Sequence, residues 1–552
     1  MPNATELETV ETGPDAAPSA RPAPERNPWL VLVVLCGAVF MVLLDSTIVN
    51  VAQQAIIDGL GASLTQIQWI LDAYVLTYAV LLLSFGRLGD IFGRKKLFML
   101  GMAIFTAASA LCGASTLLGN ALRISPAEAL IAARVLQGAG GALMMPQTLA
   151  LVVVVFPPDQ RGAALGVWGS IVSLGAVVGP IVGGLIVTNY NWEWVFLINV
   201  PIGIVALAAT TKIVPESTDP LASRRLDWTG LVLSSAGIFA LVFGLIQGNV
   251  LGWTNPVILG LWAASLLLLA GFVFWERRAP NPMMRLELFH IRNFWVGSLI
   301  GFMFAFGMLG IFFPMTLFLQ GALGFSAIKA GLTMAPMSVM IMFVAPLAGR
   351  LTDRIGARWI LVAGLSAATV GMLMMSQGVT VETDWLILLP SLVVGGVGMG
   401  MTFAPTTTAA MADVPERFAG SASGILNTMR NVGQVLGIAV LGSVLQTSLE
   451  RHGWDRIQAV PRLSAGVQSS VVGLARDSRF ADIPAVVPPD QAALLPHIFA
   501  ALQQAFVDSM HDTLHVGAAI CVVAVALAFL IVNPRRRGGE AGERRRATVM
   551  LD

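Results

Sequence analysis

The chain has 552 residues, of which 56% are hydrophobic and only 12% are charged, and its formal net charge is +1. An ordinary globular domain has about a quarter of its residues charged. This composition therefore excludes a soluble enzyme and predicts a polytopic membrane protein. The charge balance gives no sign of a nucleic-acid partner. The three cysteines, Cys36, Cys112 and Cys521, are scattered through apolar runs and predict neither a disulfide framework nor a metal site.

Apolar segments begin after a polar stretch rich in Pro, Ala and Glu, residues 1–28, which we expect to be a disordered cytoplasmic tail without a cleavable signal peptide. Each apolar segment is long enough to cross about 30 Å of hydrocarbon. The sequence therefore predicts an all-α membrane protein with fourteen transmembrane helices, near 29–51, 67–86, 97–117, 127–155, 162–189, 194–214, 228–247, 256–275, 294–319, 327–348, 359–377, 385–411, 420–446 and 512–532.

The positive charges of the short loops predict the orientation. With the N-terminus inside, the inner loops contain sixteen Lys and Arg residues, whereas the short outer loops contain only Arg123 and Lys329. Cytoplasmic loops carry this excess. We therefore expect both termini in the cytoplasm and the chain in the plasma membrane; the basic tail 533–552 agrees.

One turn occurs twice. Gly86-Arg87-Leu88-Gly89-Asp90-Ile91-Phe92-Gly93-Arg94 follows the second predicted helix, and Gly349-Arg350-Leu351-Thr352-Asp353-Arg354-Ile355-Gly356-Ala357-Arg358 follows the tenth. The repetition indicates an internal duplication. Because eight helices separate the copies, two extra helices must lie between two pseudo-symmetric halves. We predict an N-terminal bundle (29–214), two linker helices with their flanking loops (215–292) and a C-terminal bundle (293–532). The last contains a long outer loop (447–511), in which Ala492–Ser509 is expected to form an amphipathic surface helix.

The first copy resembles the signature of the major facilitator superfamily in the loop after its second helix. The stretch Leu44–Ala52 and the fourteen-helix arrangement resemble the drug:proton antiporter branch of that superfamily. Arg134 with Gln137 and Gly138 resembles the fourth-helix motif whose arginine is linked to proton transfer. A run in the fifth predicted helix resembles the motif typical of exporters; it contains Gly175, Gly179, Pro180, Gly183 and Gly184. Glycines four residues apart give a smooth helix face, and Pro180 permits a bend.

Three ionisable residues lie inside apolar helices, where each costs about 2.5–3.5 kcal/mol at the bilayer centre. Asp45, Asp72 and Arg134 all lie six or seven residues from the outer ends of their predicted helices, or about 10 Å deep. We expect them to face one water-filled cavity, where Arg134 keeps one carboxylate ionised while the other titrates. Such a carboxylate can exchange a proton for a cation. The alternative is a charge-compensated packing site.

The thirteenth predicted helix carries a second polar group, in which four residues follow helical spacing: Asn427, Arg430, Asn431 and Gln434. Lipid would leave these groups unpaired, so a stripe of this kind indicates a cavity lining or a network of bonds between helices.

The repeated turn is predicted to form an inner gate. Asp90 is expected to pair with Arg94 or with the N-terminal end of the eleventh helix, where negative charge is favoured. The resemblance implies that this contact holds the outward-open state, with Gly86 and Gly93 shaping the turn. Asp353, Arg354 and Arg358 are the corresponding residues of the second half. Control of topology is the alternative purpose of the arginines.

These observations favour a proton-coupled antiporter that exports amphipathic, cationic drugs or toxic compounds by alternating access. Arg134 and Arg430 leave anionic or zwitterionic cargo open. Export of an endogenous metabolite or antibiotic is the second reading, and a polytopic membrane enzyme is the remote one. The expected partners are small molecules, protons and the bilayer, with no nucleic acid and no obligate protein partner. The proton gradient is expected to drive the cycle, without a cofactor or metal, because the chain has no phosphate-binding loop.

Overall fold

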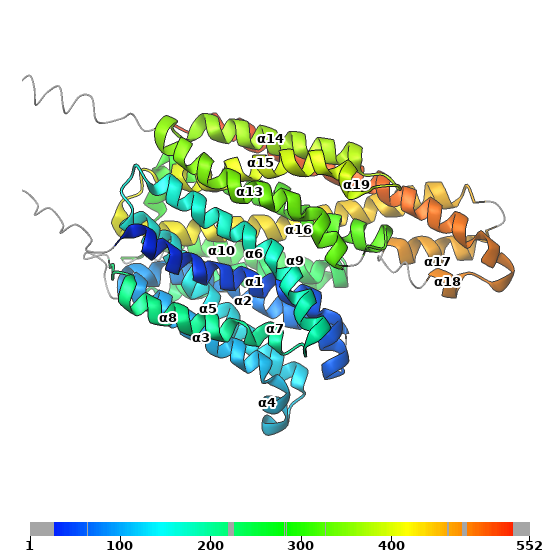
Figure 1. Ribbon diagram of the computed structural model, residues 1–552, viewed down its shortest axis with the longest axis horizontal. Coiled ribbons are helices and arrows are strands. Elements are labelled where there is room, and N and C mark those ends of the chain that lie inside the picture. Colours follow the sequence, from blue (N-terminus) through cyan, green and yellow to red (C-terminus); the bar gives the residue numbers. More distant parts are fainter. Residues whose placement is uncertain are drawn as a thin grey trace, which may run out of the picture.

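The computed structural model describes residues 27–533, except 63, 219–225, 281, 283, 326, 461–462 and 477–482. These residues form helices and turns, and no strand occurs among them. The long helices run side by side along one axis, with α16 and α19 projecting beyond the others at one end (Figure 1). The two predicted tails lie almost wholly outside the described residues.

The first half contains six long helices and two short ones. Local signals set their ends: Asn27 caps the first helix, in which Pro28 is the first residue, and Ser125 and Glu128 form a reciprocal capping box at the start of another. The elements are α1 (Pro28–Leu60), α2 (Leu64–Phe92), α3 (Arg94–Gly113), α4 (Ser115–Leu122), α5 (Pro126–Val155), α6 (Arg161–Asn189), α7 (Trp194–Leu197) and α8 (Asn199–Ile213).

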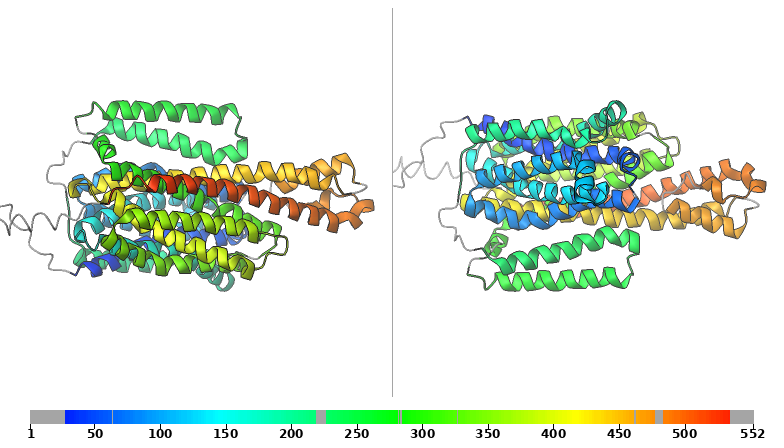
Figure 2. Two further views of the ribbon diagram at one scale, coloured as in Figure 1. Left: turned by 90° about the horizontal axis from the view of Figure 1, so that it is seen from above. Right: turned by 90° about the horizontal axis from the view of Figure 1, so that it is seen from below.

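The linker contains two helices, α9 (Trp228–Leu251) and α10 (Pro256–Glu276), which form a pair at the outside of the bundle (Figure 2). The pair touches both halves through one apolar cluster, because Ile238 and Val242 of α9 pack on Leu76 of α2 and beside Val435 of α16. Position and packing thus agree with two helices inserted between the halves.

The second half begins with a helix that changes pitch twice. It runs from α11 (Arg292–Phe304) through the π-helical turn η2 (Ala305–Leu309) to α12 (Phe312–Leu317), and ends in the π turn η3 (Phe318–Ala322). The remaining long helices are α13 (Ala327–Ile355), α14 (Ala357–Gly378), α15 (Trp385–Met411), α16 (Ala419–Ile457) and α19 (Leu495–Ala528). The short helices η1 (Leu286–His290) and η4 (Glu416–Phe418) precede α11 and α16.

The expectation of a long outer loop over 447–511 is wrong. α16 continues to Ile457, and α17 (Ala465–Arg476), α18 (Ile483–Val486) and η6 (Pro489–Leu494) lead into α19. Residues 495–509 belong to α19 rather than to a separate surface helix. Arg456–Asp508 (2.8 Å) and His452–Asp512 (3.1 Å) join the two projecting helices into a hairpin. Polar residues such as these ended the hydropathic signal before the helices ended.

Twelve helices among the described residues are long and apolar enough to cross a membrane. They include α1, α2, α5, both linker helices and α19, but neither α6 nor the pitch-changing helix from α11 to η3. The described structure therefore supports a polytopic membrane protein, with twelve candidate spans where the sequence predicts fourteen.

Candidate functional site

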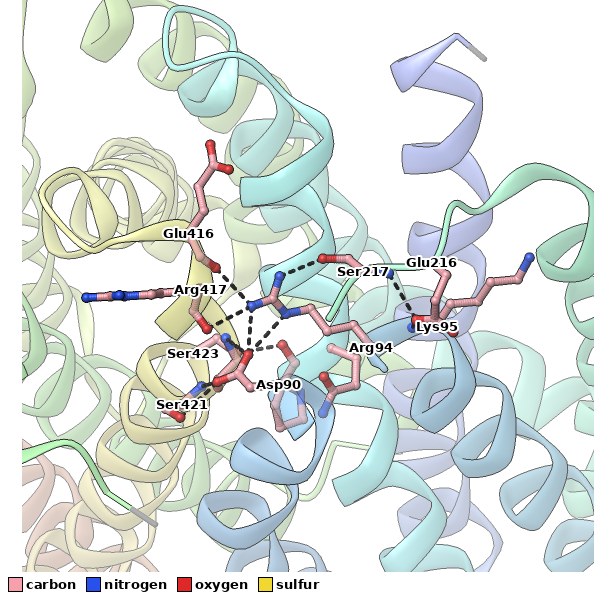
Figure 3. A network of polar contacts seen from close by, with 12 residues as sticks. Asp90, Arg94, Lys95, Glu216, Ser217, Glu416, Arg417, Ser421 and Ser423 are labelled. Carbon is pink, nitrogen blue, oxygen red and sulfur yellow. Dashed lines mark hydrogen bonds and ion pairs between the residues drawn. The ribbon is translucent and has the colours of Figure 1, made fainter. Parts of the chain in front are cut away.

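The repeated turns lie where the two halves meet, at one end of the bundle, called here the basic end. Asp90 is fully buried near the end of α2. Its carboxylate accepts hydrogen bonds from the backbone N–H groups of Gly420 (2.9 Å) and Ser421 (2.8 Å) and from the Ser421 hydroxyl (2.9 Å). These donors form the first turn of α16, where unpaired N–H groups and the helix dipole favour a negative charge. Asp90 thus joins the first half to the second (Figure 3).

Arg94 reinforces this junction (Figure 3). Its guanidinium donates to Asp90 through Nη2 at 2.7 Å and Nε at 3.1 Å, and Nη2 also donates to the backbone oxygen of Glu416 at 2.9 Å. On its other side, Nη1 donates to the Ser217 hydroxyl at 2.8 Å. Ser217 follows α8, so one buried arginine connects α2, the second half and the start of the linker.

The second copy makes the corresponding contact in the opposite direction. Asp353, near the end of α13, accepts hydrogen bonds from the backbone N–H groups of Gly162 (2.8 Å) and Ala163 (2.9 Å) in the first turn of α6. A carboxylate of each half therefore caps a helix of the other half. Arg161 and Glu416, beside the two capped turns, form an additional ion pair at 3.1 Å.

Glycines bring these helices into close contact. A Cβ on Gly86 would lie 2.8 Å from the backbone oxygen of Gly420 and from the Cα of Gly424. At the other junction, a Cβ on Gly349 would lie within 2.7 Å of the Gly162 carbonyl carbon. Real Cβ atoms do not approach backbone so closely, so any side chain at these positions would separate the halves.

Two features of the predicted turn need correction. Residues 86–92 are the last turns of α2, and the chain reverses at Gly93 alone, whose φ of 111° suits glycine. Asp90 does pair with Arg94, but it caps α16, the thirteenth predicted helix, and not the eleventh, which is α14. The residue type of Asp90 predicted that its carboxylate would cap the N-terminus of a helix. It did not predict which helix N-terminus lies beside Asp90 in the fold.

The basic residues of the second turn behave differently from Arg94. Arg354 is exposed. Arg358 contacts the rings of Trp359 and Phe529, and its backbone N–H donates to Asn533 at 3.0 Å. Asn533 follows α19 as Ser217 follows α8, so in each half the segment after the last helix binds the turn. Sequence analysis did not single out either residue.

A second polar cluster lies inside the first half. Asp45 of α1 is fully buried and accepts hydrogen bonds from Arg134 Nη1 (2.6 Å), Gln137 Nε2 (2.7 Å) and Asn199 Nδ2 (2.9 Å). The donors come from α5 and α8, and Ser109 of α3 contacts both amide groups. Three donors around one carboxylate form a compact, charge-compensated group.

Arg134 is fixed on several sides. Nη1 also donates to Gln137 Oε1 at 2.7 Å, and Nε donates to the backbone oxygen of Ile70 at 3.0 Å. The guanidinium carbon lies 4.2 Å from the centre of the Tyr74 ring, a cation–π contact. Nothing in the sequence indicated Asn199, Ser109 or Tyr74 as members of this cluster, although Asn199 is a buried amide in an apolar helix.

Asp72 does not join Asp45 and Arg134. The neighbours of Arg134 on α2 are Ile70 and Tyr74. Asp72 lies two positions from each, or about 200° around the helix, and so on the opposite face. The depth argument also fails, because α1 extends to Leu60 and places Asp45 about 22 Å from that end. Depth estimated from sequence says nothing about the face of a helix.

The glycine run of α6 packs on α1 beside Asp45. Cβ atoms on Gly175 and Gly183 would lie 2.8 Å from Leu43 Cβ and 2.9 Å from Ile48 Cγ1, and a Cβ on Gly179 would overlap Thr47. Thr47 donates to the Gly175 carbonyl at 3.2 Å. Gly184 is buried in the same helix. A bend is predicted at Pro180, whose side chain is not among those that the structure describes.

The polar stripe of α16 forms mainly local bonds. Asn427 and Asn431 donate to the backbone oxygens four residues earlier, those of Ser423 (3.0 Å) and Asn427 (2.8 Å). Gln434 is partly buried on the same helix. Arg430 reaches α15 instead, where Nη2 donates to the Thr407 hydroxyl and the guanidinium carbon lies 4.3 Å from the centre of the Phe403 ring.

Together the two halves, the buried charges and the paired junctions define a polytopic membrane protein built from two related helical bundles. In the described part of the chain, no three His, Cys, Asp or Glu side chains are grouped so as to hold a metal. Residues 35–438 match the family model described as Major Facilitator Superfamily. The chain belongs to this superfamily, and the resemblance found in the sequence is confirmed.

Relatives with names are similar to this chain over most of its length. The chain is 34% identical over 519 residues to the tetracenomycin C resistance and export protein of Streptomyces glaucescens, covering 91% of each chain. It is 36% identical over 434 residues to the multidrug resistance protein Stp of Mycobacterium tuberculosis (strain CDC 1551 / Oshkosh), covering 77% of this chain and 78% of that one. Among solved structures, the proton:xylose symporter XylE shares the fold with a TM-score of 0.57 at 13% identity, over 90% of this chain and 94% of that chain.

Proposed function

We propose that the protein is a proton-coupled exporter of amphipathic small molecules in the plasma membrane, with both termini in the cytoplasm. In this proposal α6 and the pitch-changing helix from α11 to η3 complete fourteen spans. The observation that carries the coupling is the buried group formed by Asp45, Arg134, Gln137 and Asn199. Export is supported by one relative whose name states resistance and export and by another whose name states multidrug resistance.

Protonation of Asp45 would remove the charge that attracts Arg134. The ion pair holds α1 against α5 at 2.6 Å, so its loss would loosen that contact. α1 is also bound to α6 through Thr47 and Gly175, and α6 begins at the turn that Asp353 caps. A proton at Asp45 would thus act on the junction between the halves through two packed helices.

The charge of the cargo is a further part of the proposal. The predicted preference for cations rested on two carboxylates that face a cavity. Asp45 is compensated by Arg134, so the cationic reading now rests on Asp72. Asp72 is partly exposed on α2, on the face away from the Asp45 cluster.

A second candidate is export of a compound that the producing cell makes itself. It is favoured by relatives whose names each state a single compound, tetracenomycin C and actinorhodin. The same coupling residues would serve both readings, which differ in the range of accepted cargo.

The test is efflux of a fluorescent lipophilic cation from loaded cells, with and without a protonophore. Wild type, Asp45→Asn and Asp58→Asn would be compared; Asp58 is an exposed acid on the same helix and is the matched control. We expect efflux to stop with the protonophore and in Asp45→Asn, while Asp58→Asn remains active. Efflux that continues in well-expressed Asp45→Asn would remove this carboxylate from the coupling, and efflux that ignores the protonophore would refute proton drive.

A further inference from the structure

Among the buried side-chain N–H donors that have no acceptor in the described part of the chain, two belong to side chains that contact the same ring. Arg430 is 8% exposed and its Nη1 has no partner; Trp168 is 2% exposed and its Nε1 has none. The shared ring is that of Phe403, which stacks on Trp168 with centres 5.6 Å apart and planes at 24°. Arg430 lies 4.3 Å from the centre of the same ring.

Unpaired donors of this kind are costly inside a membrane, where water does not satisfy them. The positive charge of Arg430 is also uncompensated, since the ion pairs between described residues do not include it. Arg134, by contrast, is neutralised by Asp45. Asp72 does not compensate this charge either. Measured along their helices, Asp72 lies about 30 Å from the basic end and Arg430 about 16 Å, so the two residues lie in different layers of the bundle.

The three side chains occupy one layer between the halves. Trp168 comes from α6 of the first half, and Phe403 and Arg430 come from α15 and α16 of the second. Counted from the basic ends of their helices, they lie about 10, 12 and 16 Å deep. The stack therefore crosses the surface along which the two halves meet, and Phe403 remains only partly buried there.

We propose that Trp168, Phe403 and Arg430 form a subsite for a planar aromatic acid in the proposed exporter, on which this inference rests; the subsite adds an acidic cargo class to the cations that the reading at Asp72 favours. The ring of the cargo packs on Trp168 and Phe403 when the halves separate at the basic end. Its anionic group accepts from Arg430 Nη1 and Trp168 Nε1. A guanidinium suits a carboxylate because its planar N–H groups match the two oxygens, and low local dielectric strengthens the pair.

Equilibrium binding to purified protein in lipid nanodiscs tests the subsite without a proton gradient. The probes are radiolabelled 2-naphthoate, neutral 2-naphthalenemethanol and cationic 2-naphthylmethylammonium, which share one ring system and differ in charge. We expect wild type to prefer naphthoate. Arg430→Gln should lower naphthoate affinity by about tenfold or more and leave the alcohol unchanged. Arg278→Gln, which removes an exposed positive charge beyond α10, is the matched control and should bind as wild type.

Trp168→Phe retains a ring but loses the N–H donor, and it should weaken naphthoate binding several-fold. This variant tests the subsite on its own if Arg430→Gln does not elute as a folded protein. Equal affinity of wild type for the three probes, no binding of naphthoate, or unchanged naphthoate affinity in the folded variants would overturn the subsite. Those results would leave proton coupling intact. Conversely, normal efflux by Asp45→Asn would refute the coupling and leave the preference for aromatic acids standing.

Discussion

Replacing Asp90 by Asn should open the basic end far more than the same change at Asp353. The Asp90 carboxylate accepts three hydrogen bonds from Gly420 and Ser421 across the junction, and it is fully buried. An asparagine keeps one acceptor oxygen and no charge. Hydrogen bonds to charged groups contribute about 1.5–3 kcal/mol each. We therefore expect Asp90→Asn to destabilise the closed junction by about 2–4 kcal/mol.

Asp353→Asn should have a smaller effect, because that carboxylate accepts two hydrogen bonds and is partly exposed. A loss of about 1–2 kcal/mol corresponds to a shift of roughly fivefold to thirtyfold in the open-to-closed ratio, whereas Asp90→Asn should shift it by about thirtyfold or more. Glu287→Gln, an exposed acid in η1, is the control and should shift nothing.

Spin labels on Lys96 and Ala412 would measure this ratio. Both positions are exposed and lie on different halves, and electron-electron distance distributions would report the population in which the basic end is open. The reasoning is refuted if Asp90→Asn leaves the distribution as in wild type, or if Asp353→Asn opens the protein more than Asp90→Asn does.

Three further predictions concern the buried charges and the close helix contact. Arg134→Lys keeps the charge but loses the forked N–H groups, so efflux should fall to near background at normal expression; wild-type efflux would contradict this. Asp72→Asn should weaken export of dications more than of monocations, as measured by paired efflux assays, and equal losses would exclude a second charge site. Gly86→Ala puts a methyl group 2.8 Å from Gly420 backbone, so labelling kinetics should show an opened basic end; Gly37→Ala, with nothing within 4 Å, should behave as wild type.

Sequence reasoning found the elements that repeat or that carry charge inside the membrane. The two Gly-Arg-Asp turns placed both junction carboxylates, because a duplicated motif reports the symmetry of the halves. The cost of burying a charge alone also placed a carboxylate beside Arg134, but it did not decide between Asp45 and Asp72. These inferences needed only residue type and position along the chain.

The features that sequence reasoning missed depend on which helix faces and which loops meet in three dimensions. Asp72 has the right residue type, but the face of α2 toward Arg134 belongs to Ile70 and Tyr74. Ser217 and Asn533 are neutral residues in polar segments, so nothing in their surroundings distinguishes them from ordinary loop positions. The projecting ends of α16 and α19 were missed because hydropathy measures contact with lipid rather than helix formation.

In the proposed orientation, the hairpin of α16 and α19 would give the transport cycle a reporter on the outer surface. α16 has 39 residues, or about 58 Å of helix, whereas the hydrocarbon layer is about 30 Å thick. Its first turn is the one that Asp90 caps, and its far end lies beyond the bundle in Figure 1. A rigid rod pivoting within the membrane moves its two ends in opposite directions. Release of a contact a few ångströms long at one surface would therefore swing the tip on the other, where an antibody or nanobody bound to the hairpin would sense, or arrest, the cycle from outside the cell.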